Sequence, residues 1–188
     1  MRPLAILILA AGLWAADPAP GTQPQIPRQS PELAIQLPGK VIQISQYKGY
    51  ICVLAFMSTT CPHCQHLATV MAALQPEYAQ KGVQMLGVTL NAEANTDLPN
   101  FTRVFAHNSF PIGMSVEPIA RKYLEHPPGL PYFPMIAFLD KKGVIRAEHL
   151  GATDPTFFDE RTEVQNIRGE LDKIIAQPVV QLPAAKKK

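Results

Sequence analysis

Apolar residues recur along the chain with two different periods, and these periods predict the order of strands and helices. Residues 33–45 contain two short runs of alternating apolar and polar positions around Pro38 and Gly39, which is typical of a β-hairpin. The runs ICVLAFM at 51–57 and VQMLGVTL at 83–90 are mostly apolar, as strands buried on both faces are. We therefore expect a hairpin followed by two central strands.

The segment between the two central strands is predicted to be an amphipathic helix from Pro62 to about Gln80, with Gly82 just beyond its end. Pro76 is expected to kink it. A strand, a helix and a second strand at this spacing imply a right-handed crossover between parallel strands. The apolar positions at helical spacing are Leu67, Val70, Met71, Leu74 and Tyr78.

The second half of the chain continues the alternation of helices and strands. The elements expected there are a helix capped near Asp97, a strand over 111–116, a helix over 118–126, a hairpin over 134–150 and a closing helix over about 157–176. The sequence therefore predicts the α/β class, with a central mixed β-sheet flanked by helices and an N-terminal β-hairpin extension.

The two ends of the chain differ in composition from this domain, which is expected to span residues 32–178. Arg2 precedes about a dozen apolar residues that end in small ones, so residues 1–16 are predicted to be a secretory signal peptide. Residues 17–31 are predicted to be a proline-rich linker, and residues 179–188 a basic tail. Because a membrane span needs roughly twenty apolar residues, we expect cleavage without a stable span, and export to the periplasm or beyond the cell.

The formal net charge of +2 comes from the chain ends. Without Arg2 and the three C-terminal lysines, 17 basic residues become 13, against 15 acidic ones. This balance provides no basic face for nucleic acid, so nucleic-acid binding is excluded from the expected functions.

Two of the three cysteines lie in the stretch STTCPHCQ, where Cys61 and Cys64 mark the predicted junction of a buried strand with a helix. The first helical turn has unpaired N–H groups and a partial positive charge, which stabilise a thiolate. Pro62 suits the first helical position because its missing N–H would have no partner there. We therefore interpret Cys61 as an exposed nucleophile and Cys64 as the resolving cysteine that attacks the mixed disulfide.

His63, between the cysteines, is interpreted as a second influence on the thiolate. An imidazole that is charged or donates a hydrogen bond lowers a thiol pKa and so stabilises the reduced form. Stabilising the reduced form makes the disulfide a stronger oxidant. Pro62 and His63 are therefore predicted to tune the pKa of Cys61.

From about Glu32 onward the sequence resembles the thioredoxin-fold redoxins of the TlpA/ResA type, which are exported thiol-disulfide oxidoreductases. The resemblance rests on the hairpin LAIQLPGKVIQISQYKG, the site FMSTTCPHC and the segment FPMIAFLDKKGVI. It implies a cis-proline at Pro134, opposite the cysteines, with the Phe133 backbone placed to pair with an incoming peptide strand. The expected partners are protein thiols and disulfides and an upstream redox partner; we expect a monomer with no cofactor and no metal.

The sequence departs from these families where a proton carrier is usual. Ala55 occupies the place of the buried acid of thioredoxins, and Leu67 that of the glutamate of ResA-type proteins. The usual tryptophan near the first cysteine is absent, and the dipeptide Pro62-His63 is similar to that of DsbA, the oxidising member of the superfamily. Another group or water must therefore carry the proton of Cys64, and the direction of electron flow stays open.

Other interpretations of the cysteine pair differ in what they require. Haem attachment needs a histidine directly after the second cysteine, and Gln65 excludes it. A peroxiredoxin-like thiol peroxidase would use Ser58, three positions before Cys61, although Leu54 replaces the upstream proline of such sites. The peroxidase therefore remains the principal alternative.

A copper- or zinc-binding module is the less favoured alternative, because its ligands would crowd into one helical turn. These ligands would be Cys61, His63, Cys64 and His66. A purely structural Cys61–Cys64 disulfide would close a very short loop and stabilise the fold little. Cys52, within the first central strand, is interpreted as an inert core thiol.

Overall fold

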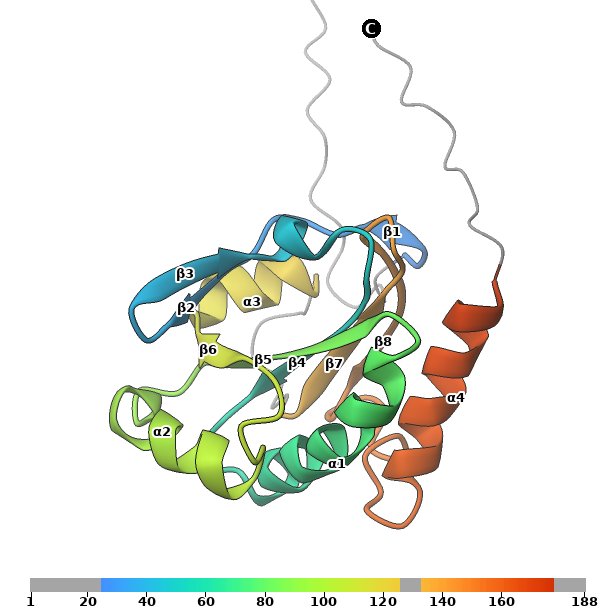
Figure 1. The fold of residues 1–188 in the computed structure, drawn as a ribbon. Coiled ribbons are helices and arrows are strands. Elements are labelled where there is room, and N and C mark those ends of the chain that lie inside the picture. The colour runs from blue at the N-terminus through green and yellow to red at the C-terminus, as the bar shows by residue number, and fades with distance from the viewer. Residues whose placement is uncertain (1–24, 126–132, 178–188) are drawn as a thin grey trace, which may run out of the picture.

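The computed structural model describes residues 25–125 and 133–177, which form one mixed eight-stranded sheet with helices on both faces (Figure 1). The sheet order is β1-β8-β7-β4-β5-β6-β2-β3. The strands are β1 (Arg28–Gln29), β2 (Ala34–Leu37), β3 (Lys40–Gln43), β4 (Ile51–Met57), β5 (Val83–Thr89), β6 (Ile112–Met114), β7 (Met135–Leu139) and β8 (Val144–Leu150). The helices are the 3-10 helix η1 (Ile44–Tyr47) and the α-helices α1 (Pro62–Ala79), α2 (Ala94–Val104), α3 (Glu117–Tyr123) and α4 (Glu163–Ala176).

Strand β4 lies at the centre of the sheet, parallel to β5 and antiparallel to β7. All seven of its residues are buried, which explains its continuous apolar run. The α1 helix connects β4 to β5, so the predicted parallel crossover is confirmed. The β2–β3 hairpin joins the far edge through the pair Gln36–Met114.

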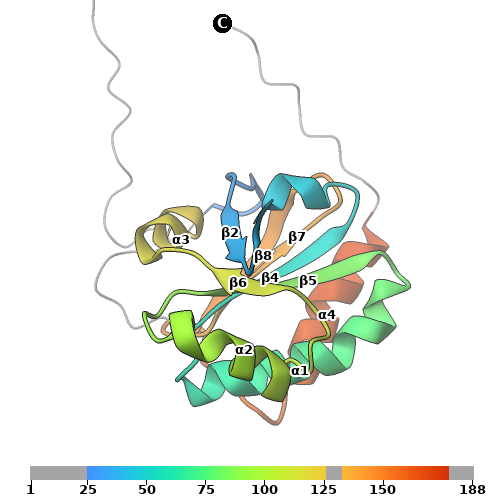
Figure 2. The ribbon, with the colours of Figure 1, turned by 60° about the vertical axis from the view of Figure 1, so that its left-hand side comes forward.

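The core is split by the sheet into two clusters, because successive side chains of a strand point to opposite faces. Val53, Ala55 and Met57 pack with residues of α1, α2 and α4 on one face. Leu54 and Phe56 pack with the β2–β3 hairpin and α3 on the other. Figures 1 and 2 show the same division, with α3 alone on its side of the sheet among the labelled α-helices.

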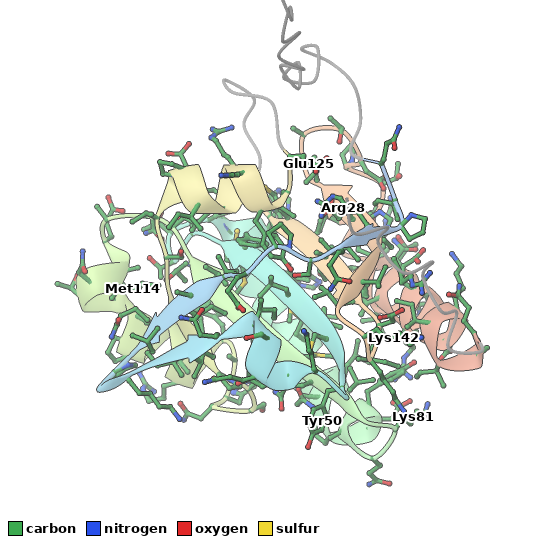
Figure 3. The ribbon with its side chains drawn as sticks, turned by 90° about the horizontal axis from the view of Figure 1, so that it is seen from above. Arg28, Tyr50, Lys81, Met114, Glu125 and Lys142 are labelled. Carbon is green, nitrogen blue, oxygen red and sulfur yellow. The ribbon has the colours of Figure 1, made fainter. Side chains whose placement is uncertain are left out.

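The predicted linker was too long at its C-terminal end, because Arg28 and Gln29 form β1 and pair with β8. The Arg28 guanidinium donates hydrogen bonds to the Glu148 carboxylate and to the Tyr123 carbonyl. Glu125 Oε1 lies 3.6 Å from Arg28 Nε, and both residues are labelled in Figure 3. The fold thus extends before residue 32, because β1 pairs with β8 and Arg28 bonds to the buried Glu148.

Two predicted helix boundaries are also corrected. The α2 helix begins at Ala94 rather than near Asp97. The α4 helix begins at Glu163 rather than near Phe157, because Phe157 lies in a turn and its ring packs into the core. The apolar character of Phe157 therefore reflects its burial in the core and not a place on the apolar face of a helix.

The predicted signal peptide, the first part of the linker and the basic tail lie outside the described residues. Within the described ranges, every helix is too short or too polar to cross a membrane.

Candidate active site

The two cysteines lie where β4 gives way to α1, at the junction predicted from the sequence. Cys61 is the N-cap residue, with an extended backbone (φ −85°, ψ 120°), and Pro62 occupies the first turn. The Gln65 N–H donates to the Cys61 carbonyl at 3.0 Å, the first bond of the helix. Cys61 is half-buried and Cys64 is fully buried, and both are free thiols.

The environment of Cys61 favours its thiolate. The Cys64 thiol, hydrogen-bonded to this sulfur, is the largest influence and lowers the pKa of Cys61 to about 6 although burial opposes the shift. The backbone N–H groups of Cys64 and His63 and the charge of His63 act in the same direction. Cys61 therefore carries a thiolate at neutral pH.

The environment of Cys64 favours its protonated thiol. Its hydrogen bond to Cys61 and its burial raise its pKa far above that of an ordinary thiol, and the charge of Glu163 adds to the shift. The Ser58 N–H donates to Cys64 Sγ at 3.4 Å. The pair thus consists of one accessible thiolate and one buried thiol that keeps its proton.

The loop before Cys61 is fixed from outside the motif by Asn91, which follows β5. The Thr59 N–H donates to Asn91 Oδ1 at 3.0 Å, and Asn91 Nδ2 donates to Thr59 Oγ1 at 2.8 Å. Gln65 Nε2 donates to the Thr59 carbonyl at 3.0 Å. Sequence reasoning missed Asn91; its signal was a polar residue just after the second of two parallel strands, whose carboxyl ends share one edge of the sheet.

The Ser58 side chain, which a peroxidase interpretation would use, bonds within its own loop. Its hydroxyl lies 3.1 Å from Thr60 Oγ1 and accepts a hydrogen bond from the Thr60 N–H. Its backbone N–H is directed at the resolving cysteine. The Ser58 contacts therefore brace the loop and the buried thiol.

The peptide bond between Phe133 and Pro134 is cis, as the resemblance implied. Met135 pairs with Phe56, so Pro134 lies at the end of β4 that leads to the cysteines. Phe133 and Cys61 are both partly buried against the same core cluster. The structure thus brings the two predicted parts of the site to one end of the sheet.

Gly151, after β8, supports this segment and was not identified from the sequence. Its N–H donates to the Pro134 carbonyl at 2.9 Å. A Cβ at this position would lie 3.0 Å from the Pro134 oxygen and 3.1 Å from the Phe133 oxygen. Only glycine therefore fits against these carbonyl groups without displacing them.

Cys52 lies in the core at the opposite end of β4. Burial raises its pKa to about 12, in agreement with an inert thiol. Among residues 25–125 and 133–177, there is no group of three His, Cys, Asp or Glu side chains that could hold a metal ion. The described residues thus supply no observation in favour of a metal-binding module.

The chain is similar in sequence to several known proteins. The pattern of the AhpC/TSA family matches residues 23–148. The chain is 27% identical over 152 residues to the thiol-disulfide oxidoreductase ResA of Bacillus thuringiensis, covering 80% of this chain and 79% of that protein. It is 26% identical over 141 residues to the thioredoxin-like protein YneN of Bacillus subtilis, covering 73% and 78%.

A solved structure supports the fold. A thiol:disulfide interchange protein of the thioredoxin family from Chlorobium tepidum superimposes with a TM-score of 0.61 at 18% identity, covering 79% of this chain and 99% of that one. The predicted thioredoxin fold is therefore confirmed.

Proposed function

The chain belongs to the AhpC/TSA family, and from this premise we propose that it is an exported thiol-disulfide oxidoreductase that exchanges disulfides with proteins through Cys61 and Cys64. Relatives and structural neighbours agree on this enzyme class. The observation that carries the proposal is the contrast within the pair. A half-exposed cysteine with a pKa of about 6 contacts a buried cysteine whose pKa is raised.

The exchange follows from this contrast. The Cys61 thiolate attacks one sulfur of a substrate disulfide, that bond breaks, and the other substrate sulfur leaves with the electron pair. Cys64 then loses its proton and attacks Cys61 Sγ, and the second substrate sulfur leaves as a thiolate. The substrate is reduced, and Cys61 and Cys64 are oxidised to a disulfide. The reverse sequence donates the disulfide to a dithiol.

The Phe133–Pro134 segment is proposed as the place where the substrate chain binds. It lies at the end of the sheet that carries the cysteines, and Phe133 is only partly buried. An extended peptide there would pair with backbone groups in the manner of an added strand. Protein disulfides suit this site better than small molecules, because backbone pairing requires a chain.

Export to an oxidising compartment is supported by the sequence of residues 1–16 and is part of the proposal. In such a compartment the protein would need an upstream redox partner to restore Cys61 and Cys64 after each exchange. We propose that it acts as a monomer. Size-exclusion chromatography with light scattering tests this statement directly.

The proposed function is tested by disulfide exchange with a model protein substrate, using the chain without residues 1–16. Cys61→Ser should abolish exchange, and Cys64→Ser should accumulate a mixed disulfide with the substrate that mass spectrometry detects. Cys52→Ser is the matched control, because it removes a thiol remote from the site and should retain exchange. Unchanged exchange by Cys61→Ser would refute the assignment.

Thiol peroxidase activity is the second candidate, because the lowered pKa of Cys61 would also serve attack on a peroxide. Consumption of hydrogen peroxide at an undiminished rate by Cys64→Ser would favour it. We expect peroxide consumption by Cys64→Ser to be slow compared with disulfide exchange by the unmodified protein.

A further inference from the structure

Glu163, the first residue of α4, is a buried acid that the exchange scheme leaves unexplained. Its side chain is 1% exposed, and its Oε2 atom is buried without a hydrogen-bond partner. Buried carboxyl groups are ordinarily paired, because removing an unpaired charge from water is costly. A buried carboxyl group without a partner calls for an explanation, and such groups cluster at functional sites.

The group that faces Glu163 is His66 on α1. His66 Nε2 lies 3.4 Å from Glu163 Oε2, and it too is buried without a hydrogen-bond partner. The remainder of the imidazole is accessible, since the His66 side chain is 33% exposed. The two side chains therefore connect a buried carboxyl group with solvent, across a contact that a small movement would turn into a hydrogen bond.

Val164, the residue after Glu163, packs against the core cluster that contains Cys64, so the start of α4 lies against the part of the core that holds the resolving cysteine. His66 follows Cys64 by two residues on the same helix, and the negative charge of Glu163 acts on the Cys64 thiol. The ionisable groups that interact with Glu163 are His66, which contacts it, and Cys64 of α1 and Glu160 of the turn before α4, which act on it through their charges. Burial first, and then the charge of Glu160, raise the pKa of Glu163 to about 8. A carboxyl group in this range can both accept and release a proton near neutral pH.

We propose that Glu163 accepts the proton of Cys64 when Cys64 attacks the mixed disulfide, and that His66 relays this proton to solvent. The inference rests on the proposed function and supplies the proton acceptor that the apolar Ala55 and Leu67 do not.

The S–H bond of Cys64 breaks and its proton passes to the Glu163 carboxylate. The Cys64 Sγ–Cys61 Sγ bond forms, the bond between Cys61 and the substrate breaks, and the electron pair leaves with the substrate sulfur. Glu163 then passes its proton to His66 and solvent. When a dithiol reduces the Cys61–Cys64 disulfide, the same path returns a proton to Cys64.

The two sulfur reactions can be separated with 5,5′-dithiobis(2-nitrobenzoate), added to the reduced protein in a stopped-flow spectrometer. Attack by Cys61 releases a first thionitrobenzoate, and resolution by Cys64 releases the second. For Glu163→Gln we expect an unchanged first release and a second release slowed about 10- to 100-fold at pH 7, the lower range of general acid–base effects. The increase of the second rate with pH, centred near 8 in the unmodified protein, should disappear.

Two variants make the result specific. Glu170→Gln removes a carboxylate that lies about two turns further along the same helix and pairs with Lys173, and it should leave both releases unchanged. His66→Gln should slow the second release less than Glu163→Gln, because it interrupts only the path to solvent. Thermal unfolding of each variant shows whether the fold is intact, and Glu163→Asp, which keeps the acid, should recover part of the rate if it folds.

The outcomes separate this inference from the proposed function. A folded Glu163→Gln variant with the rate and pH profile of the unmodified protein in its second release would overturn the role of Glu163 while exchange itself stands. Absence of both releases from the unmodified protein would instead overturn the proposed function.

Discussion

Asn91 and Thr59 hold each other by two hydrogen bonds, the Thr59 N–H to Asn91 Oδ1 at 3.0 Å and Asn91 Nδ2 to Thr59 Oγ1 at 2.8 Å. The loop that presents Cys61 is thereby tied to the end of the neighbouring strand, by a residue that lies outside the stretch STTCPHCQ. The position of the nucleophile depends on a side chain from the segment that follows β5.

Replacing Asn91 by alanine should therefore loosen the loop. It leaves a partly buried N–H of Thr59 without its acceptor, which costs about 1–3 kcal/mol of stability. We expect a lower free energy of unfolding in urea and slower disulfide exchange. Asn95→Ala is the control, because the Asn95 side chain donates to the exposed Ala92 carbonyl rather than to the loop; equal losses for both variants would contradict this role of Asn91.

Alkylation of Cys61 should depend on pH with a midpoint of about 6. Because the pKa is lowered, the thiolate and its reactivity are present above the midpoint and lost as the pH falls through it. Iodoacetamide labelling followed by mass spectrometry measures this profile, and Cys52→Ser keeps the buried thiol from contributing. A midpoint near that of an ordinary thiol would contradict the electrostatics of the site.

Replacing His63 by alanine should make the Cys61–Cys64 disulfide a weaker oxidant. The imidazole charge lowers the pKa of Cys61, so its loss raises that pKa and destabilises the reduced form. We expect a potential about 10–30 mV more negative, up to a tenfold change in the equilibrium with glutathione. His107→Ala, remote in the sequence from the cysteines, is the control, and an unchanged potential in His63→Ala would leave His63 without a tuning role.

The stability of the reduced protein should fall as Glu163 ionises. Its folded pKa is raised to about 8 from 4.5, so its contribution is fully present below pH 4.5 and lost as the pH rises through 8. Glu163→Gln should remove this loss and be more stable than the unmodified protein above pH 8. Urea unfolding at pH 5 and pH 9 measures the difference, and the same pH dependence in both proteins would show that Glu163 is already ionised in the fold at low pH.

Removing the Arg28 side chain should destabilise the fold strongly. Glu148 is 3% exposed, and burial raises its pKa to about 7 although Arg28 opposes the shift, so without Arg28 this carboxyl group either binds a proton or keeps a charge that lacks its principal cationic partner. Arg28→Ala should lose about 3–5 kcal/mol, the range for one partner of a buried pair. The double variant Arg28→Met, Glu148→Leu should lose less, because no uncompensated charge remains; urea unfolding of the three proteins tests this, and a greater loss in the double variant would refute the argument.

Much of the fold is predictable from the sequence, because the patterns that indicate strands and helices involve residues close together in the chain. Alternating and continuous apolar runs marked β2, β3, β4 and β5, and residues three and four positions apart marked α1. The boundaries of α2 and α4 were less accurate, because a buried aromatic residue such as Phe157 has the same sequence signal in a turn as in a helix. The sequence pattern places Arg28 in a linker, because its buried partner, Glu148, lies 120 positions away in the chain.

The sequence by itself determined the chemistry that is available: two cysteines three positions apart at a strand-to-helix junction, a proline on a later strand, and the lack of an acid at positions 55 and 67. Only the tertiary structure decided how these groups are supported. Asn91, Gly151 and Glu163 contact or face the site from distant segments, and their roles depend on burial and on distances across the sheet. Strands and helices follow from the preferences of residues that are neighbours in the sequence. The burial of a charged side chain depends instead on how elements far apart in the chain pack together.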